Sequence, residues 1–227
     1  MKKVAIFDVD GTIFRSSLLV ELVNELVAEG LFPPKAKEMY EKEHMLWLDR
    51  KGSYEAYIEA VIVSFMKYLK GVHYADFDRA TQVVIKQHKD RVYKFTRDLI
   101  KSLKKKRYFL LAISQSPKRI LDEFCRDLGF DKVYGRFYEL GPTDRFTGAV
   151  EDEHLIANKA NIVKRAVERE HLSLTDSVGV GDTEGDVSFL EMVDNPICFN
   201  PNARLYKFAR RNGWRVVVER KDVVYEI

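Results

Sequence analysis

The chain has 227 residues, of which 46% are hydrophobic and 32% charged, a composition typical of a globular protein with a sizeable core. Basic residues exceed acidic ones by only three and are spread along the chain, so we expect no nucleic-acid partner. No apolar stretch has bilayer length and Asp8 interrupts the basic start, so we expect no membrane partner and a cytoplasmic location. Two cysteines without metal or disulfide spacing, Cys125 and Cys198, are predicted to be buried thiols; the oligomeric state stays open.

The first predicted strand, residues 3–7, is a continuous apolar run that ends in the sequence DVDGT at 8–12. Such a run is typical of a strand buried on both faces of a parallel sheet, and the carboxyl ends of these strands are where open α/β folds bind ligands. Asp8 and Asp10 would share one face, so a cation or a shared proton must offset their repulsion. Gly11 permits a sharp turn and Thr12 adds a hydroxyl. A solvated turn is the alternative from this motif alone.

Residues 16–90 contain helical patterns and no predicted strand. We expect Ser16 or Ser17 to cap a first helix, Pro33 and Pro34 to open a second, and Ser53 to cap a third. A fourth helix is predicted over 74–88. The sequence therefore predicts a helical insert at 16–90 within a core formed by 1–15 and 91–227.

A second apolar strand, residues 108–113, ends in the sequence SQSP at 114–117. Ser116 and Pro117 are expected to cap and open the next helix, which leaves Ser114 as a spare hydroxyl at the sheet edge. Satisfying local backbone groups is the alternative role for Ser114. Two short β-prone pieces around residues 141–145 then predict a strand that leads into a small hairpin.

Further polar groups follow at two later element ends. Lys159 lies in the first turn of a helix predicted over 158–171, where the helix dipole disfavours a cation, so either solvent or a nearby anion must hold it. Asp182 and Asp186 follow a short strand at 177–180, and capping explains only one of them. Another strand is predicted at 196–199, and residues 216–218 are expected to form the last strand, at the edge of the sheet.

Carboxylates, a hydroxyl and a lysine at successive strand ends are the groups that phosphoryl transfer requires, because positioning and charge neutralisation carry most of that catalysis. Carboxylate oxygens favour Mg²⁺ over zinc or copper. These motifs resemble, in order, those of the haloacid dehalogenase superfamily of aspartate-nucleophile phosphatases. Its phosphoserine phosphatase-like branch is the most similar, because of the helical insert and the residues Asn200 and Pro201. The resemblance implies a Rossmann-like, doubly wound, mainly parallel α/β sheet with an inserted helical cap domain.

The resemblance also implies a role for each motif residue in the hydrolysis of a small-molecule phosphomonoester. Asp8 would be the nucleophile that forms an aspartyl-phosphate, and Asp10 the acid and base. Mg²⁺ would be bound by Asp8, Asp182 and the main-chain carbonyl of Asp10, with Asp186 supporting them. The implied phosphate-binding residues are Ser114, Lys159, Gly11, Thr12 and Gln115.

Several points of function stay open. Where phosphoserine phosphatases have a glutamate and an arginine for the substrate, this chain has Ser17 and Glu59, so phosphoserine is a doubtful substrate, and Gln115 replaces a glycine. Phosphoryl transfer to an acceptor and non-catalytic phosphate binding are the alternatives to hydrolysis. For the aromatic residues of the insert there are two alternatives: they line a substrate pocket, or they pack in the core of the insert. These residues are Tyr40, Trp47, Tyr54, Tyr57 and Tyr68.

Overall fold

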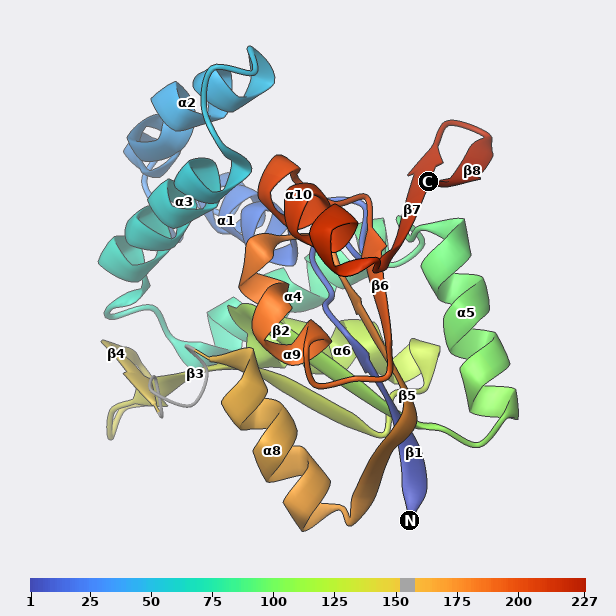
Figure 1. Cartoon of the computed structure of the whole chain (residues 1–227). Coiled ribbons are helices and arrows are strands. Elements are labelled where there is room, and N and C mark those ends of the chain that lie inside the picture. The colour runs from blue at the N-terminus through green and yellow to red at the C-terminus, as the bar shows by residue number, and fades with distance from the viewer. Residues whose placement is uncertain (152–157) are drawn as a thin grey trace. The chain divides into compact units, whose positions relative to one another are not determined.

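The computed structural model describes residues 1–151 and 158–227 (Figure 1). The chain divides into two compact units, a core unit formed by Met1–Arg15, Asp90–Arg136 and Asp152–Ile227, and a helical unit formed by Ser16–Lys89 and Phe137–Glu151. The chain therefore passes from one unit to the other more than once. No helix among the described residues is long and apolar enough to cross a lipid bilayer.

The core unit is built on a mainly parallel sheet. Its parallel strands follow the order β3 (Lys132–Leu140), β2 (Phe109–Pro117), β1 (Lys2–Phe7), β5 (Leu172–Gly181), β6 (Asn195–Phe199) and β7 (Arg215–Arg220). Since β2 lies on one side of β1 and β5 on the other, the strand order reverses between β1 and β5, where doubly wound folds bind their ligands. The predicted doubly wound α/β class is confirmed.

Helices cover both faces of this sheet, which explains the continuous apolar runs in its central strands, β1 and β2. On one face, Val4 and Ile6 of β1 join a core cluster with α8 (Lys159–Arg169), α9 (Val187–Leu190) and α10 (Ala203–Asn212). On the other face lie α5 (Lys94–Lys105) and α6 (Lys118–Leu128), both in contact with β2, and Phe7 packs edge-on against Phe130. A strand with both faces covered keeps no polar side, as the run at residues 3–7 indicates.

The helical unit contains the four predicted helices, α1 (Leu18–Ala28), α2 (Lys35–Leu48), α3 (Tyr54–Leu69) and α4 (Tyr74–His88). Ser17 and Ser53 cap α1 and α3 by accepting hydrogen bonds from backbone N–H groups of the first turn. The predicted hairpin forms between residues 137–140 and β4 (Phe146–Glu151). It belongs to this unit because Tyr138 packs on Phe65 and Phe146 packs on Phe77.

The aromatic residues of the helical unit contact one another. Tyr57 stacks with His44 at a ring-centroid distance of 4.7 Å and with Trp47 at 5.6 Å. Tyr40 and Tyr57 are buried, whereas Trp47 is partly exposed. Packing between α2 and α3 is thus the role that the structure gives to this cluster.

Three expectations about the elements are wrong. The strand expected at 177–180 is longer, because β5 (Leu172–Gly181) begins at Leu172. Ser116 is not a helix cap, because β2 continues through Pro117 in extended conformation and α6 begins at Lys118 without a side-chain cap; the Ser116 hydroxyl instead donates to Asp10. The strand expected at 216–218 is not at the edge, because β8 (Val223–Glu226) pairs antiparallel with β7. That terminal strand was not predicted; its apolar residues Val223, Val224 and Tyr225 are exposed.

Candidate active site

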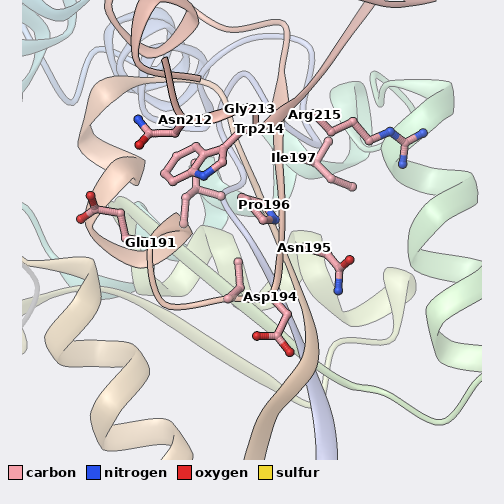
Figure 2. Close-up of a pocket in the computed structure, with 11 residues that line it drawn as sticks. Glu191, Asp194, Asn195, Pro196, Ile197, Asn212, Gly213, Trp214 and Arg215 are labelled. Atoms are coloured by element: carbon pink, nitrogen blue, oxygen red, sulfur yellow. The ribbon is translucent and has the colours of Figure 1, made fainter. Parts of the chain in front are cut away.

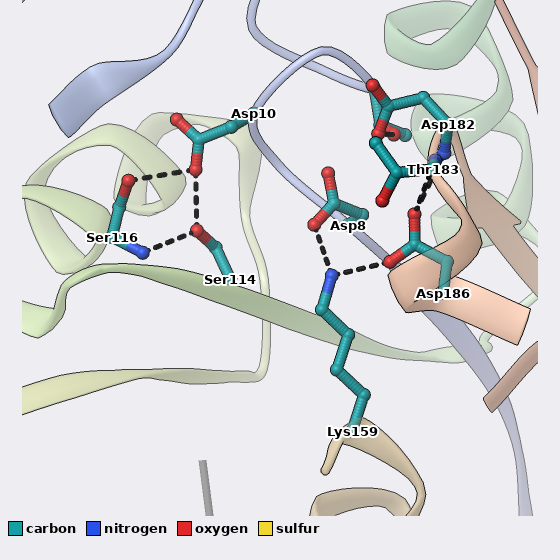
Figure 3. A network of polar contacts seen from close by, with 9 residues as sticks. Asp8, Asp10, Ser114, Ser116, Lys159, Asp182, Thr183 and Asp186 are labelled. Carbon is teal, nitrogen blue, oxygen red and sulfur yellow. Dashed lines mark hydrogen bonds and ion pairs between the residues drawn. The ribbon is translucent and has the colours of Figure 1, made fainter. Parts of the chain in front are cut away.

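The carboxyl ends of β1, β2 and β5 and the start of α8 bring the predicted motif residues into one network (Figure 3). Asp8 follows β1 directly, and its N–H donates to the carbonyl of Val180 on the neighbouring strand β5 at 2.9 Å. Asp182 follows the end of β5. The reversal of strand order between β1 and β5 therefore places the two carboxylates side by side.

A single lysine lies among three buried carboxylates, those of Asp8, Asp182 and Asp186, whose candidate ligand oxygens lie within 4.8 Å of one another. The Nζ atom of Lys159 is 2.6 Å from Asp8 Oδ1 and 2.5 Å from Asp186 Oδ1. The anion that the helix dipole argument requires for Lys159 is therefore supplied by the protein itself. One ammonium does not balance three carboxylates, so the cluster keeps an excess of negative charge if all three are ionised.

Burial shifts the proton affinities of these groups. Burial and, to a smaller extent, the neighbouring acids Asp186 and Asp10 together raise the pKa of Asp8 to about 7, against the opposing charge of Lys159. Burial also raises the pKa of Asp182 well above its ordinary value, and the charge of Asp8 adds to that shift. For Lys159 burial lowers the pKa, but Asp186 and Asp8 outweigh it, so the pKa is raised and the ammonium stays charged.

The cluster fits a divalent cation. Asp8 Oδ2 is buried and has no hydrogen-bond partner among the described residues, which is costly for a carboxylate oxygen unless a cation binds it. All the donors are oxygens, the type that Mg²⁺ prefers. Asp8 and Asp182, the residues expected to bind the metal, are thus together in a site of the right charge, and Asp10 follows two residues after Asp8.

The turn after β1 is packed against Asp182. Gly11 has a φ of 81°, and a Cβ atom added to it would lie 2.1 Å from Asp182 Oδ2. Thr12 Oγ1 donates to Asp182 Oδ1 at 3.1 Å, and the N–H of Gly11 donates to the carbonyl of Phe14. In the structure Gly11 and Thr12 therefore hold the turn and the Asp182 carboxylate.

Gly11→Ala is expected to lower Mg²⁺ affinity about 10- to 100-fold, because the methyl group would displace a metal-binding carboxylate. Gly30→Ala is the matched control, since Gly30 also has a positive φ, of 74°, but no neighbouring atom within 4 Å of an added Cβ. Isothermal titration calorimetry with MgCl₂ measures both. Equal Mg²⁺ affinities in the two variants would contradict the packing argument.

Asp10 has a different environment from Asp8. Its Oδ2 atom accepts hydrogen bonds from Ser114 Oγ at 2.5 Å and from Ser116 Oγ at 2.9 Å, and the Ser116 N–H donates to Ser114 Oγ. The sequence analysis missed Ser116 as a site residue. The sequence does contain a pattern that could have identified Ser116. If β2 continues past Ser114, side chains alternate along the strand, so Ser114 and Ser116 lie on the same side.

Asp186 connects the lysine to the loop after β5. One of its oxygens accepts from Lys159, and the other accepts from the backbone N–H groups of Asp182 at 2.9 Å and Thr183 at 3.0 Å. The carbonyl of Asp182 accepts from the N–H of Asn202, which follows β6. Asp186 therefore holds Lys159 and the backbone of the loop after β5 in place.

Gln115 is the predicted phosphate-binding residue that the structure leaves outside this network. Its side chain is exposed, and its Oε1 atom accepts a hydrogen bond from Arg136 at 2.9 Å. Since it lies between Ser114 and Ser116 on an extended strand, its side chain points away from theirs.

A cavity of about 630 Å³ lies elsewhere in the core unit (Figure 2). Its walls include Asn195 and Arg215, the first residues of β6 and β7, together with Pro196 and Trp214. Because these strands are parallel to β1, the cavity lies at the amino ends of the strands, opposite the edge that carries Asp8. It contains none of the predicted site residues.

Comparisons with known proteins identify a family and several similar phosphatases. The model of the haloacid dehalogenase-like hydrolase family matches residues 5–191. A phosphoserine phosphatase of Mycobacterium tuberculosis is 25% identical over 216 residues, which cover 93% of this chain and 69% of that protein. A histidinol-phosphatase of Neisseria meningitidis is 24% identical over 223 residues, which cover 96% of this chain and 99% of that protein.

Solved structures share the fold. A Bordetella pertussis protein of unknown function has a TM-score of 0.74 at 18% identity, covering 95% of this chain and 98% of its own. A phosphoserine phosphatase with an analogue of the phospho-aspartyl intermediate has a TM-score of 0.65 at 22% identity, over 97% of this chain and 95% of its own. On the match over residues 5–191, the chain belongs to the haloacid dehalogenase-like hydrolase family, and within that family it is similar to the phosphoserine phosphatases.

Proposed function

We propose that the protein is a Mg²⁺-dependent phosphatase that hydrolyses a small-molecule phosphomonoester through an aspartyl-phosphate on Asp8. The observation that carries this proposal is the buried cluster of Asp8, Asp182 and Asp186 around Lys159, with Asp10 held separately by two serines. The family membership and the phosphatases among the relatives support it. The helical unit, Ser16–Lys89 and Phe137–Glu151, is proposed to be the cap domain that selects the substrate.

In the first half-reaction, a carboxylate oxygen of Asp8 attacks phosphorus and the bond from phosphorus to the leaving oxygen breaks. Asp10 donates a proton to that oxygen, so the product leaves as a neutral alcohol. In the second half-reaction, Asp10 takes a proton from water, the water oxygen attacks phosphorus, and the bond to Asp8 breaks to release phosphate. The Ser116 hydroxyl fixes the Asp10 carboxyl through both steps, and the Ser114 hydroxyl turns from Asp10 to the phosphoryl group when the substrate binds.

Positive charge at the site offsets the charge of the phosphoryl group. Lys159 has three N–H donors, of which Asp8 and Asp186 use two, so the third is proposed to bind a phosphoryl oxygen. The Ser114 hydroxyl is proposed to bind a second. When bound by Asp8, Asp182 and the carbonyl of Asp10, Mg²⁺ supplies further positive charge and keeps Asp8 ionised.

Phosphoserine phosphatases are expected to hold their substrate with a glutamate and an arginine, and this chain has Ser17 and Glu59 at the corresponding positions. Ser17 is buried and its hydroxyl caps α1, and Glu59 is exposed on α3. Neither forms a site for an amino acid substrate. We therefore propose no activity on phosphoserine, and the substrate class is left as a small-molecule phosphomonoester.

The direct test is release of phosphate from p-nitrophenyl phosphate and from a panel of metabolite phosphomonoesters that includes phosphoserine and histidinol phosphate. We expect release with MgCl₂ and none with EDTA. No metal-dependent release from any ester would overturn the proposal. Recovery of phosphate on an added alcohol, and not in solution, would identify a phosphotransferase instead.

A further inference from the structure

The strand β8 forms one edge of the sheet (Figure 1). It pairs with β7 and is the last strand in the sheet order, so among residues 1–151 and 158–227 no strand pairs with its outer side. Its pairing with β7 runs from Val223 to Glu226 without a register shift. By contrast β4, at the other end of the strand order, has a register shift in its pairing and a glycine, Gly148, with a φ of 91°. Irregularities of that kind protect an edge strand from pairing with another chain, whereas β8 has a regular edge.

The backbone of β8 presents hydrogen-bonding groups on this outer side. The N–H of Ile227 donates to the carbonyl of Val216 on β7 at 3.1 Å. Because backbone groups alternate between the two sides of an antiparallel strand, every second residue before Ile227 also bonds to β7, and Val224 and Glu226 direct their N–H and C=O groups outward. The outer edge therefore offers donors and acceptors in the spacing that a further antiparallel strand would use.

The side chains of β8 are mostly apolar and lie at the surface. Val223, Tyr225 and Ile227 share one side of the strand, and Val224 lies on the other. All four are between 40% and 54% exposed. Adjacent exposed apolar side chains on a regular, unpaired edge strand mark a surface that binds another strand.

A second copy of β8 fits this edge best in one register. Residues that exchange hydrogen bonds in an antiparallel pair lie directly opposite each other. Val224 and Glu226 can therefore bond to the same two residues of a second copy only if the two-fold axis passes through Val224, Tyr225 or Glu226. An axis through Glu226 puts that carboxylate opposite its own copy, and an axis through Val224 puts it opposite Asp222, so both registers oppose like charges, which destabilises a strand pair. An axis through Tyr225 puts Glu226 opposite Val224 and avoids this repulsion.

We propose that the protein forms a symmetric homodimer in which the β8 strands of two copies pair antiparallel around Tyr225, so that their two core sheets become continuous. Val224 and Glu226 of each copy then exchange backbone hydrogen bonds with Glu226 and Val224 of the other. On the opposite side of the strand pair, the two Tyr225 rings lie between two contacts of Val223 with Ile227. The strands β5, β6 and β7 separate β8 from β1 in the sheet order, so this contact does not involve β1.

Sedimentation velocity over a range of protein concentrations tests the dimer. We expect the mass to rise from that of one chain to that of two with a Kd of about 10 to 100 µM, because one strand from each copy gives a small interface. Val224→Pro removes an outward N–H and no bond to β7, so it should weaken dimerisation about 10- to 100-fold. Val224→Thr, which alters the same side chain and keeps the N–H, is the matched control and should dimerise like wild-type protein. A single chain at every concentration, or equal dimerisation of the two variants, would overturn the proposal.

Cysteine cross-linking tests the register and does not depend on the proline variant. The two native cysteines, Cys125 and Cys198, are buried and do not interfere. Tyr225→Cys places a thiol opposite its own copy, at a Cα separation of about 4.5 Å that a disulfide can span. In a glutathione redox buffer this variant should form a covalent dimer on a non-reducing gel much faster than Glu226→Cys, whose thiol would lie opposite a valine. Faster cross-linking of Glu226→Cys, or of neither variant, would contradict the pairing around Tyr225.

Discussion

Asp8→Asn is expected to lower kcat by at least about 10³-fold, because an amide is a poor nucleophile and no aspartyl-phosphate can form on it. Asparagine keeps nearly the same shape, and Lys159 keeps its second partner, Asp186, at 2.5 Å. The loss would therefore not come from a collapsed site. The measurement is phosphate release together with mass spectrometry of rapidly acid-quenched protein, in which only wild-type protein should gain a phosphoryl group.

The matched control is Asp98→Asn, on the exposed surface of α5, where the carboxylate pairs only with nearby basic residues. It makes the same chemical change away from the site and is expected to keep wild-type kcat. Retained turnover in Asp8→Asn, or a phosphoryl group on that variant at another residue, would remove Asp8 from its assigned role.

The second large effect is a pH-dependent stabilisation by Mg²⁺. In the folded, metal-free protein, burial is the main reason that the pKa of Asp8 rises from 3.8 to about 7. The pKa of Asp182 is also raised, again chiefly by burial. A raised carboxyl pKa favours folding below the unfolded value near 4, and this contribution is lost as pH rises through about 7. The metal-free protein should therefore lose stability over that range, and Mg²⁺, which binds the ionised carboxylates, should restore it.

Thermal unfolding in EDTA and in MgCl₂ tests this expectation. At about 100 times the Kd, bound Mg²⁺ adds about 2.7 kcal/mol, which raises Tm by about 5 to 10 °C in a chain of this size. This increase of Tm by Mg²⁺ should be largest near pH 8 and small near pH 5. Asp182→Asn should remove the gain while raising Tm in EDTA, because it removes a buried negative charge. A gain that is independent of pH, or one that survives in Asp182→Asn, would contradict the charge argument.

The site was largely predictable because strand ends are readable in the sequence. Each of the three apolar runs that end near residues 8, 114 and 182 is a parallel strand of the core unit, and parallel topology brings their carboxyl ends to one edge. The position of Lys159 left solvent and a nearby anion as alternatives, and in the structure its ammonium pairs with an anion. What the sequence did not show is that the anion in the structure comes from Asp8 and Asp186.

The remaining errors share a physical cause. Ser116 and Pro117 have strong helix-start propensity, but the pairing of β2 with β3 and the hydrogen bond to Asp10 keep them extended. The terminal strand β8 is exposed, and its backbone pairing with β7 and the ion pair between Arg215 and Glu226 hold it in place. Tertiary contacts decided each case, and local propensity did not.

The hairpin that joins the helical unit also limits how the two units can be separated. β3 begins in the core unit and ends in the helical unit, and the aromatic faces of Tyr138 and Phe146 lie on Phe65 and Phe77. Removing residues 16–89 alone would leave these two rings without their partners, a new apolar surface that favours aggregation. A core unit that remains soluble without its helices therefore has to lose 137–151 as well, so evolution or design can exchange the helical unit only by replacing two segments of the chain together.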